Sequence, residues 1–200
     1  MIEWLNHIDT ALFLALNGIH FSILDTPFWY ISQVAIWIPL YAVLLYLIIR
    51  QDSKDFTEFH WQTIVGLVVC IVLAITMADQ LSSGLLKPLV GRLRPSHDPS
   101  LDGLVHLLTD PNGHIYKGGK YGFVSSHAAN TLALAAFISK ALQYRAWNTV
   151  IWIWAITVSY SRIYLGVHYP GDIICGGLIG VISGSLFGFI YQKWRMKWIS

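Results

Sequence analysis

The stretch IICGGLIGVISGSLFGFIY, residues 173–191, contains no charged residue and is long enough to cross the hydrocarbon layer of a membrane as a helix. Within it, glycine recurs at every fourth position, at Gly176, Gly180, Gly184 and Gly188. Small residues at this spacing let neighbouring membrane helices approach closely. The stretch therefore predicts a membrane-spanning helix that packs tightly within a bundle.

Similar apolar runs occupy much of the rest of the chain, at residues 28–49, 61–81, 127–142 and 147–164. Of the 200 residues, 55% are hydrophobic and 12% are charged, which is about half the charged fraction of an ordinary soluble domain. Trp and Tyr gather near the ends of the runs, as they do at membrane surfaces. We therefore predict an all-α fold, a polytopic membrane helical bundle with five full spans in a single domain, residues 1–200.

Two segments depart from this pattern. Residues 1–27 contain a short apolar run that is interrupted by Asn17 and His20, and we interpret this segment as an interfacial helix or re-entrant piece, with a sixth full span as the alternative. Residues 82–126 form a long polar loop, and a segment of that length between spans is usually functional.

The chain carries a net charge of only +2 and lacks an internal basic run, so nucleic acid is not an expected partner. Its two cysteines, Cys70 and Cys175, lie inside apolar runs and are interpreted as small buried residues. No spacing of histidines and carboxylates requires a metal ion. We expect no cofactor and no obligate protein partner.

Three polar stretches fall at span ends on one face of the predicted membrane, KPLVGRLRP at residues 87–95, VSSHAAN at residues 124–130 and SRIYLGVHYPGD at residues 161–172. They supply three cations, Lys87, Arg94 and Arg162. Fixed cations that converge repel one another unless an anion lies between them, and phosphate has the charge and the geometry that guanidinium groups match. The stretches therefore predict a phosphate site in which the hydroxyls of Ser125 and Ser126 join the three cations as phosphate-binding groups. Arg92 is placed equally well for a lipid headgroup and for the reacting phosphate.

Two helix N-termini are expected at the same place. Ser125 and Ser126 precede an apolar run as an N-cap does, and Pro170 with Asp172 marks the first turn of the last span. The N–H groups and the partial positive charge at such helix ends favour a phosphoryl group.

Two histidines and one aspartate complete the candidate site. His168 lies four residues before Asp172, so the carboxylate can accept the imidazole N–H and leave the other ring nitrogen free as a nucleophile. His127, at the mouth of another helix, is placed to protonate the leaving oxygen.

These stretches resemble the three-part signature of the type 2 phosphatidic acid phosphatase superfamily, which also contains vanadium haloperoxidases and glucose-6-phosphatase. The first matches K-x6-R-P, the third matches S-R-x5-H-x3-D, and the second matches the core of P-S-G-H with Val124 for Pro and Ser126 for Gly. The resemblance implies a helical bundle in which Lys87, Arg94, Arg162 and Ser125 bind phosphate. It also implies that His168 is the nucleophile, that Asp172 is its partner and that His127 is the general acid.

The expected function is that of a membrane-embedded phosphatase of lipid phosphates or diphosphates that acts through a phosphohistidine. Candidate substrates are undecaprenyl diphosphate, lipid A phosphates, phosphatidylglycerol phosphate and phosphatidic acid, with a preference for the first two. Two alternatives stay open, a phosphotransferase with a lipid or sugar acceptor and a non-catalytic protein that binds anionic lipids. A vanadate-dependent peroxidase is disfavoured because the known type is soluble.

The basic residues orient the predicted bundle. With five spans, one face carries Arg50, Lys54, Lys140, Arg145, Lys193, Arg195 and Lys197. The other face carries Lys87, Arg92, Arg94, Lys117, Lys120 and Arg162. If Lys87, Arg94 and Arg162 are held there because they bind phosphate, they do not count toward orientation. The excess of basic residues then lies on the first face. We therefore expect a bacterial inner-membrane protein with a cytoplasmic C-terminus and a site that faces the periplasm.

Overall fold

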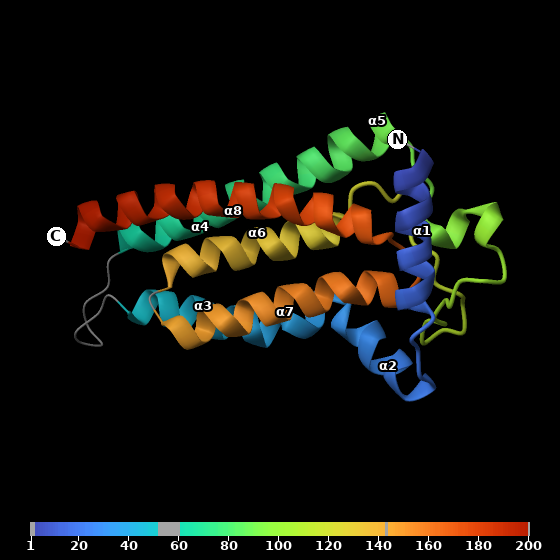
Figure 1. Cartoon of the computed structure of the whole chain (residues 1–200). Helices are drawn as coiled ribbons and strands as arrows, with labels where there is room; N and C mark the ends of the chain where they lie inside the picture. Colours follow the sequence, from blue (N-terminus) through green and yellow to red (C-terminus); the bar gives the residue numbers. More distant parts are fainter. Residues whose placement is uncertain (1–2, 52–60, 143, 200) are drawn as a thin grey trace.

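The computed structural model describes residues 3–51, 61–142 and 144–199, and every regular element within them is helical. Figure 1 shows long helices that run along one common direction, namely α4 (Trp61–Asp79), α6 (Ser126–Ala141), α7 (Arg145–Tyr164) and α8 (Pro170–Ile199). Helix α3 (Ile38–Arg50) lies beside α7, where the rings of Tyr41 and Trp154 meet edge to face. The main apolar core lies between these five helices and includes Leu67, Phe137 and Tyr191.

Helix α6 lies in the middle of the bundle and packs most closely against α8. A Cβ atom at Gly180 would lie 2.2 Å from the carbonyl oxygen of Ala129, and one at Gly184 would lie 2.0 Å from that of Ala133. Any side chain at these positions would force the two helices apart. The prediction that the glycines of the last apolar run permit close helix packing is confirmed.

The count of five full spans is not confirmed. Within the described residues, two helical stretches are long and apolar enough to cross a membrane, 61–90 and 170–198, or three if the bent pair α1 (Glu3–Asn17) and α2 (Ser22–Ile31) forms one span. Helix α6 has 16 residues and α3 has 13, and a straight helix needs about 20 to cross the hydrocarbon layer.

The expected span at residues 28–49 is wrong, because this run is broken into three pieces. Helix α2 ends at Ile31, a 3₁₀ turn η1 (Val34–Trp37) follows, and α3 begins at Ile38. The break is stabilised by the indole N–H of Trp37, which donates to the freed carbonyl of Ile31 at 2.8 Å. The break leaves Ser32, a polar residue, buried near α7.

The expected start of the polar loop at residue 82 is also wrong. The helix of α4 continues through a wider, π-helical segment, η2 (Gln80–Leu86), into the short α5 (Lys87–Val90). The left-handed conformation of Gly91, with φ of +61°, ends it. The non-helical connection therefore begins at Gly91 and contains only two short 3₁₀ turns, η3 (Pro95–His97) and η4 (Pro99–Leu101), before α6.

Helix α1 lies across the end of the bundle instead of along it (Figure 1). It meets α2 at a bend of 115°. One side of α1 packs inward through Phe13, whose ring contacts Tyr169 edge to face, while Trp4 and Ile8 are exposed. The interfacial position expected for this segment stays a prediction. Among the residues counted for orientation, Lys54 lies outside the described part of the chain.

Candidate active site

The three polar stretches meet at one end of the bundle. The end of α5, the N-termini of α6 and α8 and the C-terminus of α7 all lie at the end that α1 crosses (Figure 1). Ser125 is the N-cap of α6, and its side chain accepts the N–H of Ala128 at 3.4 Å. Helix α8 begins at Pro170, as expected. Both predicted helix starts are therefore confirmed.

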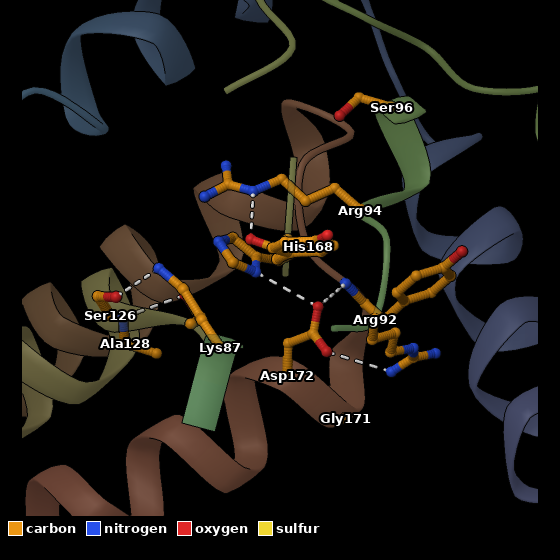
Figure 2. Close-up of polar contacts among 12 residues, drawn as sticks. Lys87, Arg92, Arg94, Ser96, Ser126, Ala128, His168, Gly171 and Asp172 are labelled. Atoms are coloured by element: carbon orange, nitrogen blue, oxygen red, sulfur yellow. Dashed lines mark hydrogen bonds and ion pairs between the residues drawn. The ribbon is translucent and has the colours of Figure 1, made fainter. Parts of the chain in front are cut away.

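His168 and Asp172 face each other at the start of α8. Nδ1 of the imidazole lies 3.3 Å from Oδ2 of the carboxylate, and both side chains are buried (Figure 2). The same oxygen accepts the N–H of Tyr169 at 3.0 Å. The contact at Nδ1 leaves Nε2 of the ring available to a substrate.

Burial and the neighbouring charges both favour the neutral form of the His168 ring. Burial and then neighbouring positive charges, of which Arg94 has the largest effect, hold the pKa of His168 well below its usual value. Lys87 and Arg162 contribute in the same direction, so all three predicted cations lie within electrostatic reach of this ring. A neutral imidazole has the free lone pair that a nucleophile requires.

Among the residues that the structure describes, the three cations lack a carboxylate partner. No acidic side chain of the described residues lies within ion-pair distance of Lys87, Arg94 or Arg162, although Arg94 and Arg162 are buried. Burial and the nearby Arg162 also lower the pKa of Arg94, as expected for guanidinium groups that repel each other. Within the described chain, Nε of Arg162 is buried without a hydrogen-bond partner. Buried, unpaired positive charge is costly, and an anion between these groups would offset the cost.

Backbone pairing positions Arg94. Leu93 and Tyr121 form an isolated antiparallel bridge, and the carbonyl of Tyr121 accepts Nε of Arg94 at 3.1 Å. Gly122 lets this pair approach Asp172, because a Cβ atom there would lie 2.8 Å from Oδ2. The guanidinium group is thereby turned toward His168 (Figure 2).

Ser126, which stands where the family signature has Gly, reaches Lys87. Its Oγ accepts Nζ of Lys87 at 2.6 Å and lies 2.6 Å from Oγ of Ser83 (Figure 2). Ser83 belongs to the π-helical segment that precedes α5. The substitution thus adds a hydroxyl that orients the lysine.

His127 lies where the polar site meets an apolar cavity of about 500 Å³. The cavity is bounded by α3, α4, α6 and α7, and its lining includes Tyr41, Val72, Leu134 and Trp154. His127 also lies within electrostatic reach of His168 and the three cations. An apolar space therefore joins the charged site at a histidine.

Sequence reasoning missed several residues that complete the site. Arg162 donates to the hydroxyl of Ser32, at the break after α2, and to the hydroxyl of Tyr116 at 3.0 Å. Arg92, expected at a headgroup or a phosphate, donates through NH1 to Asp9 and Asp172. Asp9 and Ser32 lie more than 50 residues before the first signature stretch. No local pattern marks them.

A model of the PAP2 superfamily matches residues 65–197 of the chain. The chain belongs to this superfamily. It is 44% identical to the lipid A 4'-phosphatase of Bacteroides thetaiotaomicron, with 96% of this chain and 81% of the relative covered. It is 34% identical to the lipid A 4'-phosphatase of Porphyromonas gingivalis, with 99% of this chain and 79% of the relative covered.

Solved structures share the fold. LpxE of Aquifex aeolicus superposes with a TM-score of 0.65 at 25% identity, covering 92% of this chain and 94% of that chain. A transmembrane PAP2-type phosphatidylglycerolphosphate phosphatase from Bacillus subtilis superposes with a TM-score of 0.62 at 21% identity, covering 96% and 87%. The family membership agrees with the resemblance found in the three signature stretches.

Proposed function

We propose that the protein is a membrane-embedded lipid phosphatase that works through a phosphohistidine. The observation that carries the proposal is the set of Lys87, Arg94 and Arg162, three cations that have no carboxylate partner within the described chain and lie near the buried His168. A phosphoryl group placed among them neutralises their charge. It also presents its phosphorus to the free ring nitrogen.

The reaction divides into two displacements. In the first, Nε2 of His168 bonds to phosphorus while the bond to the lipid oxygen breaks. His127, which can hold a proton once the bound phosphate offsets the charge of the three cations, gives that proton to the lipid oxygen. Asp172 stabilises the positive charge on the phosphorylated ring. In the second, His127 takes a proton from water as the water oxygen bonds to phosphorus, the P–N bond breaks and inorganic phosphate leaves. Ser125 and the N-terminal N–H groups of α6 bind the phosphoryl oxygens throughout. That the reaction needs no metal ion remains a prediction, which phosphate release measured with and without a chelator tests.

The apolar cavity beside His127 supports a lipid substrate. Its lining is almost entirely hydrophobic and spans four helices, while its polar end coincides with the proposed general acid. An acyl chain in this space would place its attached phosphate at the charged site.

Among lipid phosphates, we propose a lipid A phosphate as the substrate. The identity of 44% to a lipid A 4'-phosphatase, over most of both chains, favours it over the other candidates. Undecaprenyl diphosphate is second, because a protein named undecaprenyl-diphosphatase from Sulfolobus acidocaldarius is 28% identical over 86% of this chain.

The test is phosphate release by purified protein from a panel of four lipids: lipid A, undecaprenyl diphosphate, phosphatidylglycerol phosphate and phosphatidic acid. We expect fastest release from lipid A, a loss of at least about 10³-fold in His168→Gln, and no effect of a chelator. His114→Gln is the matched control, since His114 is an exposed loop residue. Equal activity of His168→Gln and His114→Gln would eliminate the proposed nucleophile, and loss with chelator would contradict the metal-free mechanism. If the phosphoryl group is found on a lipid or sugar acceptor, and is not released as inorganic phosphate, the protein is a transferase.

We further propose that the helices cross a bacterial inner membrane with the site at the periplasmic surface, the C-terminus in the cytoplasm and α1 in the headgroup layer. The basic residues near the C-terminus and the exposed Trp4 and Ile8 of α1 support this arrangement. Topology reporters fused after Ser200 and inserted at Ser100 test this arrangement. If both reporters lie on the same side of the membrane, the arrangement is excluded.

A further inference from the structure

Arg92 bridges two carboxylates at the edge of the site. Its NH1 donates to Oδ2 of Asp9 at 2.7 Å and to Oδ1 of Asp172 at 3.1 Å. The centre of the guanidinium group lies 3.8 Å from the centroid of the Tyr169 ring. Arg92 thus contacts one oxygen of Asp172 while His168 contacts the other (Figure 2).

Asp9 ties this arginine to the first helix. One oxygen of its carboxylate accepts Arg92, and the other accepts the N–H of Gly171 at 2.7 Å. Gly171 lies in the first turn of α8, directly before Asp172. A Cβ atom at this glycine would lie 2.7 Å from Oδ2 of Asp9, so a residue with a side chain would push the carboxylate away. Helix α1 therefore holds the N-terminus of α8 through one side chain.

The arrangement restrains the carboxylate that faces the nucleophile. Asp172 is fully buried, whereas the side chains of Arg92 and Asp9 retain 13% and 14% of their exposure. Arg92 and the N–H of Tyr169 donate to this buried carboxylate and so offset part of the cost of burying its charge. Because Asp9 accepts from the same NH1 group, it restrains the position at which Arg92 contacts Asp172.

We infer that Asp9 and Arg92 are positioning residues of the active site, which act through Asp172 on the tautomer and orientation of His168. This inference rests on the proposed function. It also extends the site beyond residues 65–197, the part that the superfamily model matches, because Asp9 belongs to α1. Both side chains act from the far side of Asp172, whose other oxygen faces His168.

Steady-state kinetics with a lipid phosphate separate positioning from binding. We expect Asp9→Asn and Arg92→Gln to lower kcat by about 10- to 100-fold with KM changed less than about 2-fold, because second contacts orient the catalytic group without touching substrate. Arg94→Gln should instead raise KM. Arg92→Lys keeps the charge and should recover part of the loss. Glu3→Gln, an exposed acid on the same helix, is the matched control and should keep its activity.

The double variant tests whether the two residues act as a unit. Asp9→Asn combined with Arg92→Gln should lose no more activity than the more damaging single variant. Multiplication of the two losses would show that they act separately and would overturn the inference. So would a rise in KM at constant kcat, or equal activity of Asp9→Asn and Glu3→Gln.

The tautomer of His168 can be measured without turnover, so it tests the positioning roles independently of the proposed function. The ring-nitrogen shifts of ¹⁵N-labelled His168, assigned with His168→Gln, report its tautomer. We expect the Nδ1–H form in the unmodified protein and a mixture of forms in Asp9→Asn and Arg92→Gln. Absence of phosphate release from the unmodified protein would refute the function. Unchanged tautomer populations in both variants would refute the positioning roles whether or not the protein turns over.

Discussion

The backbone N–H of Ser125 donates to the carbonyl oxygen of Asp172 at 3.0 Å, which joins the N-terminal ends of α6 and α8 directly. Gly176, one turn further along α8, permits this contact, because a Cβ atom there would lie 2.4 Å from the carbonyl oxygen of Ser125. The same close packing that holds the bundle together therefore sets the spacing of the groups that we propose to be catalytic.

Gly176→Ala should damage both stability and catalysis. The added methyl must push the Ser125 turn away from α8, so we expect a loss of about 1–3 kcal/mol in unfolding free energy. We also expect kcat to fall by about 100-fold, since displacements near 1 Å misalign reacting groups. Thermal unfolding in detergent and phosphate release measure the two effects.

Gly184→Ala is the matched control for this substitution. Its Cβ atom would lie 2.0 Å from the carbonyl of Ala133, a comparable clash two turns further from the site. The control should lower the melting temperature with little change in kcat. Equal losses of kcat in both variants would show that the whole helix pair, and not the Ser125 turn, governs catalysis.

The stability of the protein should fall as the pH drops below about 6.5, the usual pKa of an unfolded histidine. The folded state holds the pKa of His168 well below this value, so below pH 6.5 the unfolded chain binds a proton that the folded chain does not. Stability is therefore fully present above the unfolded pKa and is lost as pH falls toward the folded one. Melting temperatures from pH 8 to pH 5 test this.

His168→Gln removes the titrating group and should flatten part of the decline. The difference between the two curves isolates this residue from the carboxylates that also titrate. Parallel curves over the whole range would mean that His168 titrates alike in the folded and unfolded protein, which would contradict the lowered pKa of the folded state.

The sequence was sufficient to predict the groups proposed to bind phosphate and attack it. Lys87, Arg94 and His168 stand at the ends of apolar runs, where charge is costly without a purpose, so their positions alone indicated a site. Capping by Ser125 and the start of α8 at Pro170 followed from local rules on helix N-termini.

What the sequence did not predict depends on tertiary contacts. Asp9 meets Arg92 across 83 positions of the chain, and Ser32 meets Arg162 across 130. The same limit explains the wrong span at residues 28–49, which is continuous in hydropathy. Its break is stabilised by the indole of Trp37 and by Arg162, and neither contact leaves a periodic signal.

Restoring glycine at position 126 should cost little activity. Ser126→Gly removes a hydroxyl that accepts from the charged Lys87, a contact worth about 1.5–3 kcal/mol when nothing replaces it. Both side chains are only half-buried, so water can take the place of the hydroxyl, and KM should change by less than about 10-fold. Lys87→Gln removes one of the three cations proposed to bind phosphate and should raise KM by about 10- to 100-fold. Initial rates over a range of lipid concentrations compare them. A loss in Ser126→Gly as large as that in Lys87→Gln would mean that the hydroxyl itself contacts the substrate.

Filling the apolar cavity should slow the enzyme on lipids alone. Val72 lines the cavity beside His127, whereas Val69, on the same helix and similarly exposed, does not. Val72→Trp should therefore lower kcat/KM for a lipid phosphate by about 10-fold or more, because the ring occupies space that an acyl chain needs. Activity on a water-soluble phosphomonoester such as p-nitrophenyl phosphate should stay unchanged. Val69→Trp should leave both activities intact, and equal effects of the two tryptophans would show that the cavity does not receive the substrate chain.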